Sequence, residues 1–137
     1  MTPYKLLQVA LVVVGVISLL LYPVSLVWPS GWLWHADGVP HHSQYFMMIV
    51  GIYATLGVFL LNAARNPRAN LSLIWFTVWS SIVHAAIMAV QSFGHGDHLG
   101  HLWGDVPALL VVAIVLAVLV RASDLKQPSE TTPSVTT

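Results

Sequence analysis

Cysteine is absent from the 137-residue chain, and charged side chains are scarce. The lack of cysteine excludes disulfides, thiol nucleophiles and cysteine-ligated zinc or iron–sulfur centres. Asp, Glu, Lys and Arg together make up 7% of the residues, whereas soluble domains carry roughly a quarter. The formal net charge is zero, so no basic patch favours a nucleic acid as partner. These absences indicate a membrane protein, with the lipid bilayer as its surroundings.

Apolar runs fill most of the remaining sequence, which is 57% hydrophobic with a mean hydropathy of +0.78. A helix needs about 20 residues to cross a bilayer. Four spans are predicted, at about 6–28, 44–64, 71–91 and 103–120. The fourth reaches span length only if its helix begins near Trp103. We therefore predict an all-α, integral membrane four-helix bundle with antiparallel up-down-up-down order over residues 1–121. Residues 122–137 are rich in Ser, Thr and Pro and predict a disordered cytoplasmic tail.

The basic residues give an orientation. They fall at the N-terminus, in the second connection and at the C-terminus: Lys5, Arg65, Arg68, Arg121 and Lys126. Cytoplasmic segments of membrane proteins carry the excess of Lys and Arg. The pattern predicts a plasma-membrane protein with both termini in the cytoplasm and the first and third connections outside.

Small and weakly polar residues recur at helical spacing in three of the runs, which places them on one face of each helix. The sets are Gln8, Leu11, Gly15, Ser18, Tyr22 and Ser25; Gln44, Met48, Gly51, Thr55, Val58 and Asn62; and Thr77, Ser80, Ser81, His84, Met88 and Gln91. Such residues let membrane helices approach closely and hydrogen-bond to one another. We predict that all three polar stripes face inward. The fourth run offers Ala113 and Ala117 for hydrophobic packing.

Residues that favour helix starts stand just ahead of the runs: Thr2, Ser43, Asn70 and Asp105. Their side-chain oxygens can accept hydrogen bonds from the first backbone N–H groups of a helix. Pro23 lies late in the first run, where it is expected to kink the helix or shorten its last turn.

Histidines gather on the predicted outer side. Six of the seven lie in the first and third connections, where "FGHGDHLGHLWGD" (93–105) holds three of them. The candidate metal ligands are His84, His95, His98, His101, Asp97 and His35. Imidazole and carboxylate together suit a divalent transition metal such as zinc, copper or iron. The spacing matches neither H-E-x-x-H nor the Glu-x-x-His pair of di-iron bundles.

Two of these candidates have a structural alternative. His84 lies inside the third span, where ionisable groups are costly and often functional. It is either a ligand or a neutral imidazole hydrogen-bonded to a Thr, Ser or Tyr across the bundle. Asp97 stands between glycine-containing segments and suits a turn equally well.

The segments "WSSIVHAAIMAVQ" and "GHLWGDVPALLVV" (within about residues 71–121) resemble a family of small four-span bacterial membrane proteins of unknown function. The resemblance implies a four-span topology and a membrane location. It transfers no catalytic, cofactor-binding or metal-binding residue.

Three hypotheses of function remain open. The first is a small accessory or interaction protein with a histidine-rich outer face, which acts through a membrane-protein partner or a homo-oligomer. The second is a metal-binding or metal-handling protein with a His/Asp site at the outer interface. The third is a pH-responsive protein whose loop histidines charge together. No catalytic motif accompanies them, so the sequence favours a protein that is not an enzyme.

Overall fold

The computed structural model describes residues 1–27, 44–94 and 105–125. Within these ranges the chain is helical and has no strand: α1 is Pro3–Val27, α2 is Gln44–Ala63, η3 is the 3-10 turn Pro67–Asn70, α3 is Leu71–Gly94 and α5 is Asp105–Ala122. The predicted all-α class is confirmed. Three segments are long and apolar enough to cross a membrane: α1, α2 and the stretch 67–91. The apolar part of α5, Val106–Ala122, is shorter, and its predicted extension to Trp103 lies outside the described residues.

The predicted cap at the start of α1 is present, and the predicted cap at the start of α3 is not. The backbone N–H of Lys5 donates to Thr2 Oγ1 over 3.4 Å, as expected of an N-cap. The prediction that Asn70 caps the third helix is wrong. Asn66 instead caps η3, the turn that leads into α3: its Oδ1 accepts from the N–H of Ala69, and the side-chain amide of Asn70 donates to the Asn66 carbonyl. Pro67 follows this cap directly, where its missing N–H is harmless.

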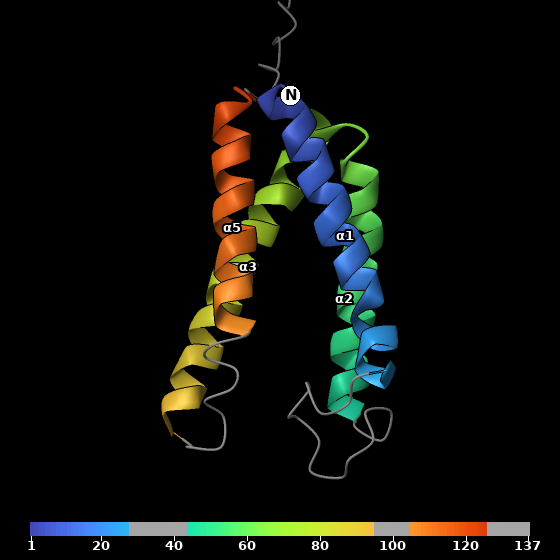
Figure 1. The fold of residues 1–137 in the computed structure, drawn as a ribbon, viewed down its shortest axis with the longest axis vertical. Helices are drawn as coiled ribbons and strands as arrows, with labels where there is room; N and C mark the ends of the chain where they lie inside the picture. Colours follow the sequence, from blue (N-terminus) through green and yellow to red (C-terminus); the bar gives the residue numbers. More distant parts are fainter. Residues whose placement is uncertain (28–43, 95–104, 126–137) are drawn as a thin grey trace, which may run out of the picture.

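The four α-helices of the described residues form two pairs. α1 packs along α2, and α3 packs along α5, while α1 and α5 join the pairs and α2 barely touches α3. Figure 1 shows that both pairs meet at the end that carries the N-terminus and diverge toward the opposite end. In the same view α1 and α3 run away from the N-terminal end, and α2 and α5 return to it.

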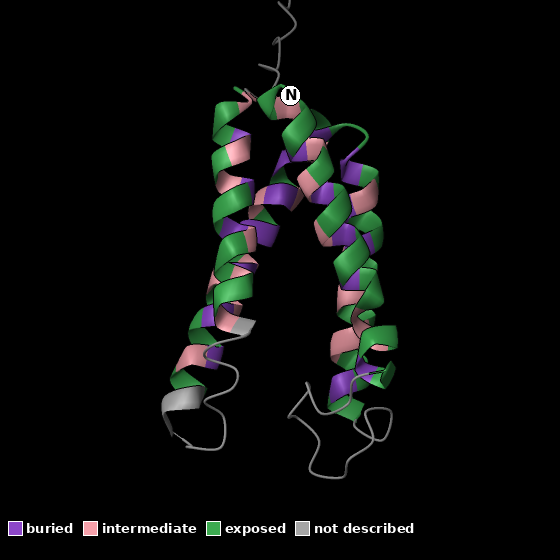
Figure 2. Ribbon diagram, in the orientation of Figure 1, coloured by how far each residue is buried: buried purple, intermediate pink, exposed green. Residues whose placement is uncertain are grey.

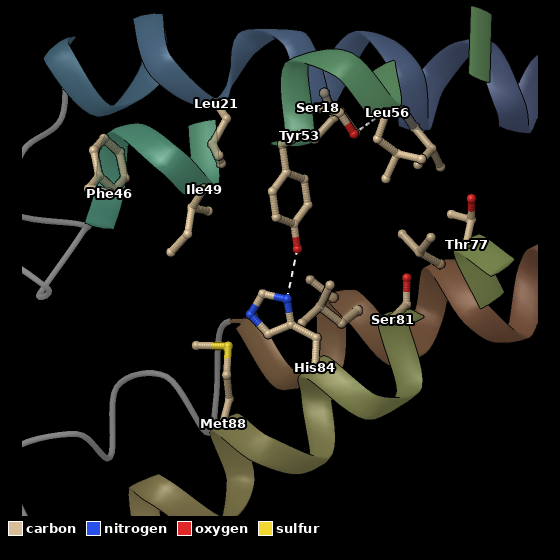
Figure 3. Close-up of a pocket in the computed structure, with 15 residues that line it drawn as sticks. Ser18, Leu21, Phe46, Ile49, Tyr53, Leu56, Thr77, Ser81, His84 and Met88 are labelled. Atoms are coloured by element: carbon tan, nitrogen blue, oxygen red, sulfur yellow. Dashed lines mark hydrogen bonds between the residues drawn. The ribbon is translucent and has the colours of Figure 1, made fainter. Parts of the chain in front are cut away.

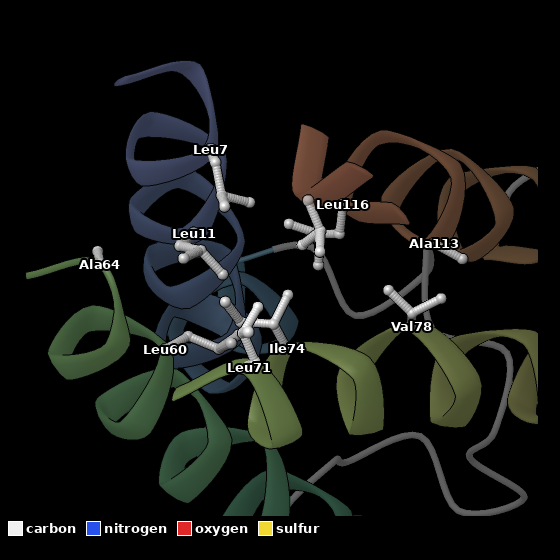
Figure 4. Packing of buried hydrophobic residues seen from close by; sticks show 10 residues of the cluster. Leu7, Leu11, Leu60, Ala64, Leu71, Ile74, Val78, Ala113 and Leu116 are labelled. Carbon is white, nitrogen blue, oxygen red and sulfur yellow. The ribbon is translucent and has the colours of Figure 1, made fainter. Parts of the chain in front are cut away.

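The hydrophobic core lies where the pairs meet. Ten buried residues form it: Leu7, Leu11, Leu60, Ala64, Leu71, Ile74, Val78, Ala113, Leu116 and Val120. Nine of them come from α1, α2, α3 and α5, and Ala64 directly follows α2; they pack together where the pairs meet (Figure 4). The buried ribbon segments in Figure 2 thin out toward the divergent end. Burial at one end therefore holds the pairs together and leaves them apart at the other.

Two glycines let α1 and α2 approach closely. A Cβ atom on Gly57 would lie 2.7 Å from the carbonyl oxygen of Gly15, and one on Gly15 would lie 3.0 Å from that of Gly57. Real Cβ atoms do not tolerate the shorter distance without a shift of the backbone. Small residues at helix crossings of this kind are typical of membrane bundles.

Of the three predicted polar stripes, two face inward and one is exposed. The stripe of α1 is buried or half-buried throughout, and that of α3 is so from Thr77 to Met88. The prediction for α2 is wrong, because its whole stripe is exposed. The face of α2 that is buried carries Phe46, Gly57 and Leu60. It is offset from the predicted stripe by two positions, about 200° around the helix.

The hydroxyl in the exposed α2 stripe is satisfied without a neighbouring helix. The Thr55 hydroxyl donates to the carbonyl of Gly51 in its own helix over 2.9 Å. Gln44 and Asn62 stand at the two ends of α2, where a helix meets water or lipid headgroups. Side-chain bonds to the preceding turn remove the need for a partner across the bundle.

Candidate functional site

A cavity of about 260 Å³ lies between the two helix pairs, beyond the core. All four helices supply its walls: Val14, Ile17, Ser18 and Leu21 from α1; Phe46, Ile49, Tyr53 and Leu56 from α2; Thr77, Ser81, His84 and Met88 from α3; and Ala108, Leu109 and Val112 from α5. Most of these side chains are apolar. We call this space the interpair cavity.

A hydrogen bond crosses the interpair cavity. The hydroxyl of Tyr53 on α2 lies 2.9 Å from Nδ1 of His84 on α3. The two rings meet edge to face with their centroids 6.1 Å apart. Figure 3 shows the tyrosine reaching out from α2 to the imidazole. This contact links the two pairs where their backbones have already separated. By helix rise His84 lies about 15 Å from the end of α3 at Gly94, well inside the helix.

The hydroxyl groups around the Tyr53–His84 pair differ in whether they have a hydrogen-bond partner. Ser18 donates to the carbonyl of Val14 over 2.8 Å, and Thr77 donates to that of Leu73 over 2.9 Å, so each is satisfied within its own helix. Ser81 is 8% exposed and points into the cavity (Figure 3). No hydrogen-bond partner of its hydroxyl lies among the residues that the structure describes. The interpair cavity thus combines apolar walls with one small polar region on α3.

Of the predicted metal ligands, the structure describes His84 alone. His35, His95, Asp97, His98 and His101 lie outside the described residues. Within the described ranges no three His, Asp or Glu side chains lie close enough to hold a metal ion. His84 instead bonds a tyrosine across the bundle, which is the structural alternative that the sequence left open. Nothing in the described part of the chain supports the metal or the pH hypothesis, and both stay predictions.

Sequence reasoning missed Tyr53. It lies two positions from the predicted stripe of α2 and therefore on a different face of the helix. A signal was present, because a phenol well inside an apolar helix needs a hydrogen-bond partner. His84 is the matching group in the third run. Pairing these two polar groups would have predicted the correct face of α2.

The fold and the interpair cavity define the class of this protein: a helical protein with membrane-length apolar helices and a largely apolar cavity. A family model described as "Family of unknown function (DUF6632)" matches residues 1–137, and the chain belongs to this family. The match covers the whole chain, beyond the 71–121 segment on which the sequence resemblance rested. No curated protein matches the chain, and no solved structure does.

Proposed function

We propose that this protein is a multi-pass plasma-membrane protein that binds a small lipophilic molecule in the interpair cavity. The observation that carries the proposal is a largely apolar cavity whose walls come from all four helices. In this proposal α5 is the fourth span of an antiparallel bundle.

Exposed side chains support the membrane setting. The outward faces carry large apolar residues on every helix, among them Val13, Ile52, Phe76, Trp79 and Ile114. In water, apolar surface of this extent would drive association. In a bilayer it faces lipid tails at no cost.

The basic residues support the orientation. The guanidinium carbon of Arg68 lies 5.9 Å from the ring centroid of Tyr4, and that of Arg121 lies 6.0 Å from the ring of Trp75. Lys5 stands near the start of α1 and Arg65 just after α2. The ends that carry these charges meet at the core, so the core end is the cytoplasmic one by the positive-inside rule.

The size and lining of the cavity support binding of a lipophile. An engineered apolar cavity of about 150 Å³ is enough to bind benzene, and the interpair cavity is larger. Its walls belong to helices that the core fixes, so the site exists before the ligand arrives. A preformed apolar site binds without a large ordering cost.

Methionine methyl groups offer a local test. In protein with ¹³C-labelled methionine methyls, reconstituted in nanodiscs, decane is titrated as the probe. The Met88 methyl lines the cavity and is expected to shift with saturation, whereas the outward-facing Met48 is expected to change at most linearly with the amount of decane. A Met88 signal that follows decane only linearly, as simple partition into lipid does, would refute the proposal.

Neighbouring leucines on α5 provide a matched pair of variants. Leu109 lines the cavity, while Leu110 is 39% exposed on the outside of the bundle. Leu109→Trp fills the space and is expected to weaken decane binding at least about tenfold, which corresponds to about 1.4 kcal/mol. Leu110→Trp should bind as the unmodified protein does. Equal losses in both variants would mean that the probe binds elsewhere.

A further inference from the structure

Ser81 is the polar group that the fold of this protein leaves unexplained. Its side chain is more than nine-tenths buried and faces the interpair cavity. Its hydroxyl has no partner among the described residues, although Ser18 and Thr77 in the same walls satisfy theirs within their helices. Buried polar groups in folded proteins nearly always have a hydrogen-bond partner. An unsatisfied hydroxyl of this kind indicates a partner that enters the cavity.

The surroundings of Ser81 restrict what that partner can be. Among the residues that the structure describes, the cavity walls contain no Asp, Glu, Lys or Arg, so an ionic headgroup would find no permanent counter-charge there. Burial of an ionised group without a counter-charge costs far more than burial of a neutral one. His84 lies one helical turn from Ser81 on the same face of α3 (Figure 3) and bonds Tyr53. The polar region is therefore small, neutral and set among apolar side chains.

We infer that the interpair cavity takes a neutral lipophile with a single hydrogen-bond-accepting oxygen, a ketone carbonyl or an alcohol, which accepts from the Ser81 hydroxyl. This inference rests on the proposed function and names the class of its ligand. The oxygen lies beside Ser81 and the Tyr53–His84 pair. The hydrocarbon tail runs along the apolar wall formed by Ile17, Leu21 and Ile49.

Four ten-carbon probes test the headgroup: decane, 2-decanone, 1-decanol and decanoate. Each is titrated into nanodiscs at known mole fraction, and the Met88 methyl shift gives its apparent Kd. Ser81→Ala is compared with Ser72→Ala, an exposed serine on the same helix. One neutral hydrogen bond corresponds to about a three- to tenfold change in affinity. We expect Ser81→Ala to weaken 2-decanone and 1-decanol by this factor and to leave decane unchanged, with no effect of Ser72→Ala. Decanoate is expected to bind at least about tenfold more weakly than 2-decanone.

The outcomes separate the inference from the proposed function. If decane binds at Met88 but Ser81→Ala changes the affinity of neither 2-decanone nor 1-decanol, the proposed function stands and the headgroup inference fails; water would then satisfy Ser81. If Ser81→Ala weakens decane as much as 2-decanone, the serine acts through packing and the inference fails as well. If decanoate binds saturably and as tightly as 2-decanone, the inference that the ligand is neutral is wrong. If no probe shifts Met88, both proposals fall together.

Discussion

The Tyr53–His84 hydrogen bond shows how two polar residues can be tolerated inside apolar helices. Each group alone would leave an unsatisfied donor or acceptor among apolar side chains. Together they satisfy each other over 2.9 Å and tie α2 to α3, two helices that otherwise barely touch. This bond therefore stabilises the molecule where the core does not reach.

Removal of the Tyr53 hydroxyl is expected to weaken the fold modestly. Tyr53→Phe keeps the ring and deletes the bond to His84, so the free energy of unfolding in bicelles should fall by about 1 kcal/mol. Tyr45→Phe, at a tyrosine that is 78% exposed, serves as the control. Reversible denaturation in SDS, followed by circular dichroism, measures both. An equal change in the two variants would show that the bond carries no stability.

At this scale the sequence predicted one partner of the pair and not the other. His84 is conspicuous, because histidine in an apolar run is rare and costly. Tyr53 is not, because tyrosine is amphipathic and often lies at membrane interfaces without a role inside the bundle. The outer histidines and Asp97 lie outside the described residues, so their predicted role stays a prediction.

Among the helices, the crossing of α1 and α2 depends on two small residues. Gly15 and Gly57 let the two backbones come into contact. Gly51, which belongs to the predicted polar stripe of α2, faces open space instead. Composition alone does not distinguish these two glycines of α2. The distinction comes from the apolar heptad of Phe46, Tyr53 and Leu60, which lies on the Gly57 side of the helix.

Alanine substitutions at the two glycines of α2 are expected to act in opposite directions. Gly57→Ala brings a methyl group against the Gly15 carbonyl and should destabilise the protein by about 1–3 kcal/mol. Gly51→Ala meets nothing within 4 Å and should stabilise it by up to about 1 kcal/mol through helix propensity. The same SDS denaturation measures both changes. A neutral Gly57→Ala would mean that the helices are not in contact there.

For the molecule as a whole, hydropathy predicted the helices but not their arrangement. Span lengths follow from the extent of each apolar run, because lipid accepts nearly any apolar face. For the same reason, the sequence contains little that distinguishes an inward face from a lipid-facing one. Pairing of α1 with α2 and α3 with α5 follows from core contacts at one end and the glycine crossing. The sequence predicts a four-helix bundle and does not predict that its two helix pairs diverge.

The absence of cysteine permits a direct test of the proposed orientation, since any introduced thiol is unique. Ala69→Cys lies in the exposed second connection, and His98→Cys lies in the third. A membrane-impermeant maleimide applied to intact cells should label His98→Cys and spare Ala69→Cys until the cells are lysed. Labelling of Ala69→Cys and not of His98→Cys in intact cells would show that the orientation is opposite to the one proposed. Labelling of both in intact cells would contradict the proposed number of spans.

The position of the core also limits what the interpair cavity can do for transport. Leu7, Leu11, Leu60, Ile74 and Leu116 close the space between the pairs at one end of the molecule. A solute that entered from the divergent end would meet this closed end. Permeation through a single chain would require the most deeply buried residues to separate. The cavity is therefore closed toward the core end, and in the proposed function a lipophile would be held on the other side of this closure.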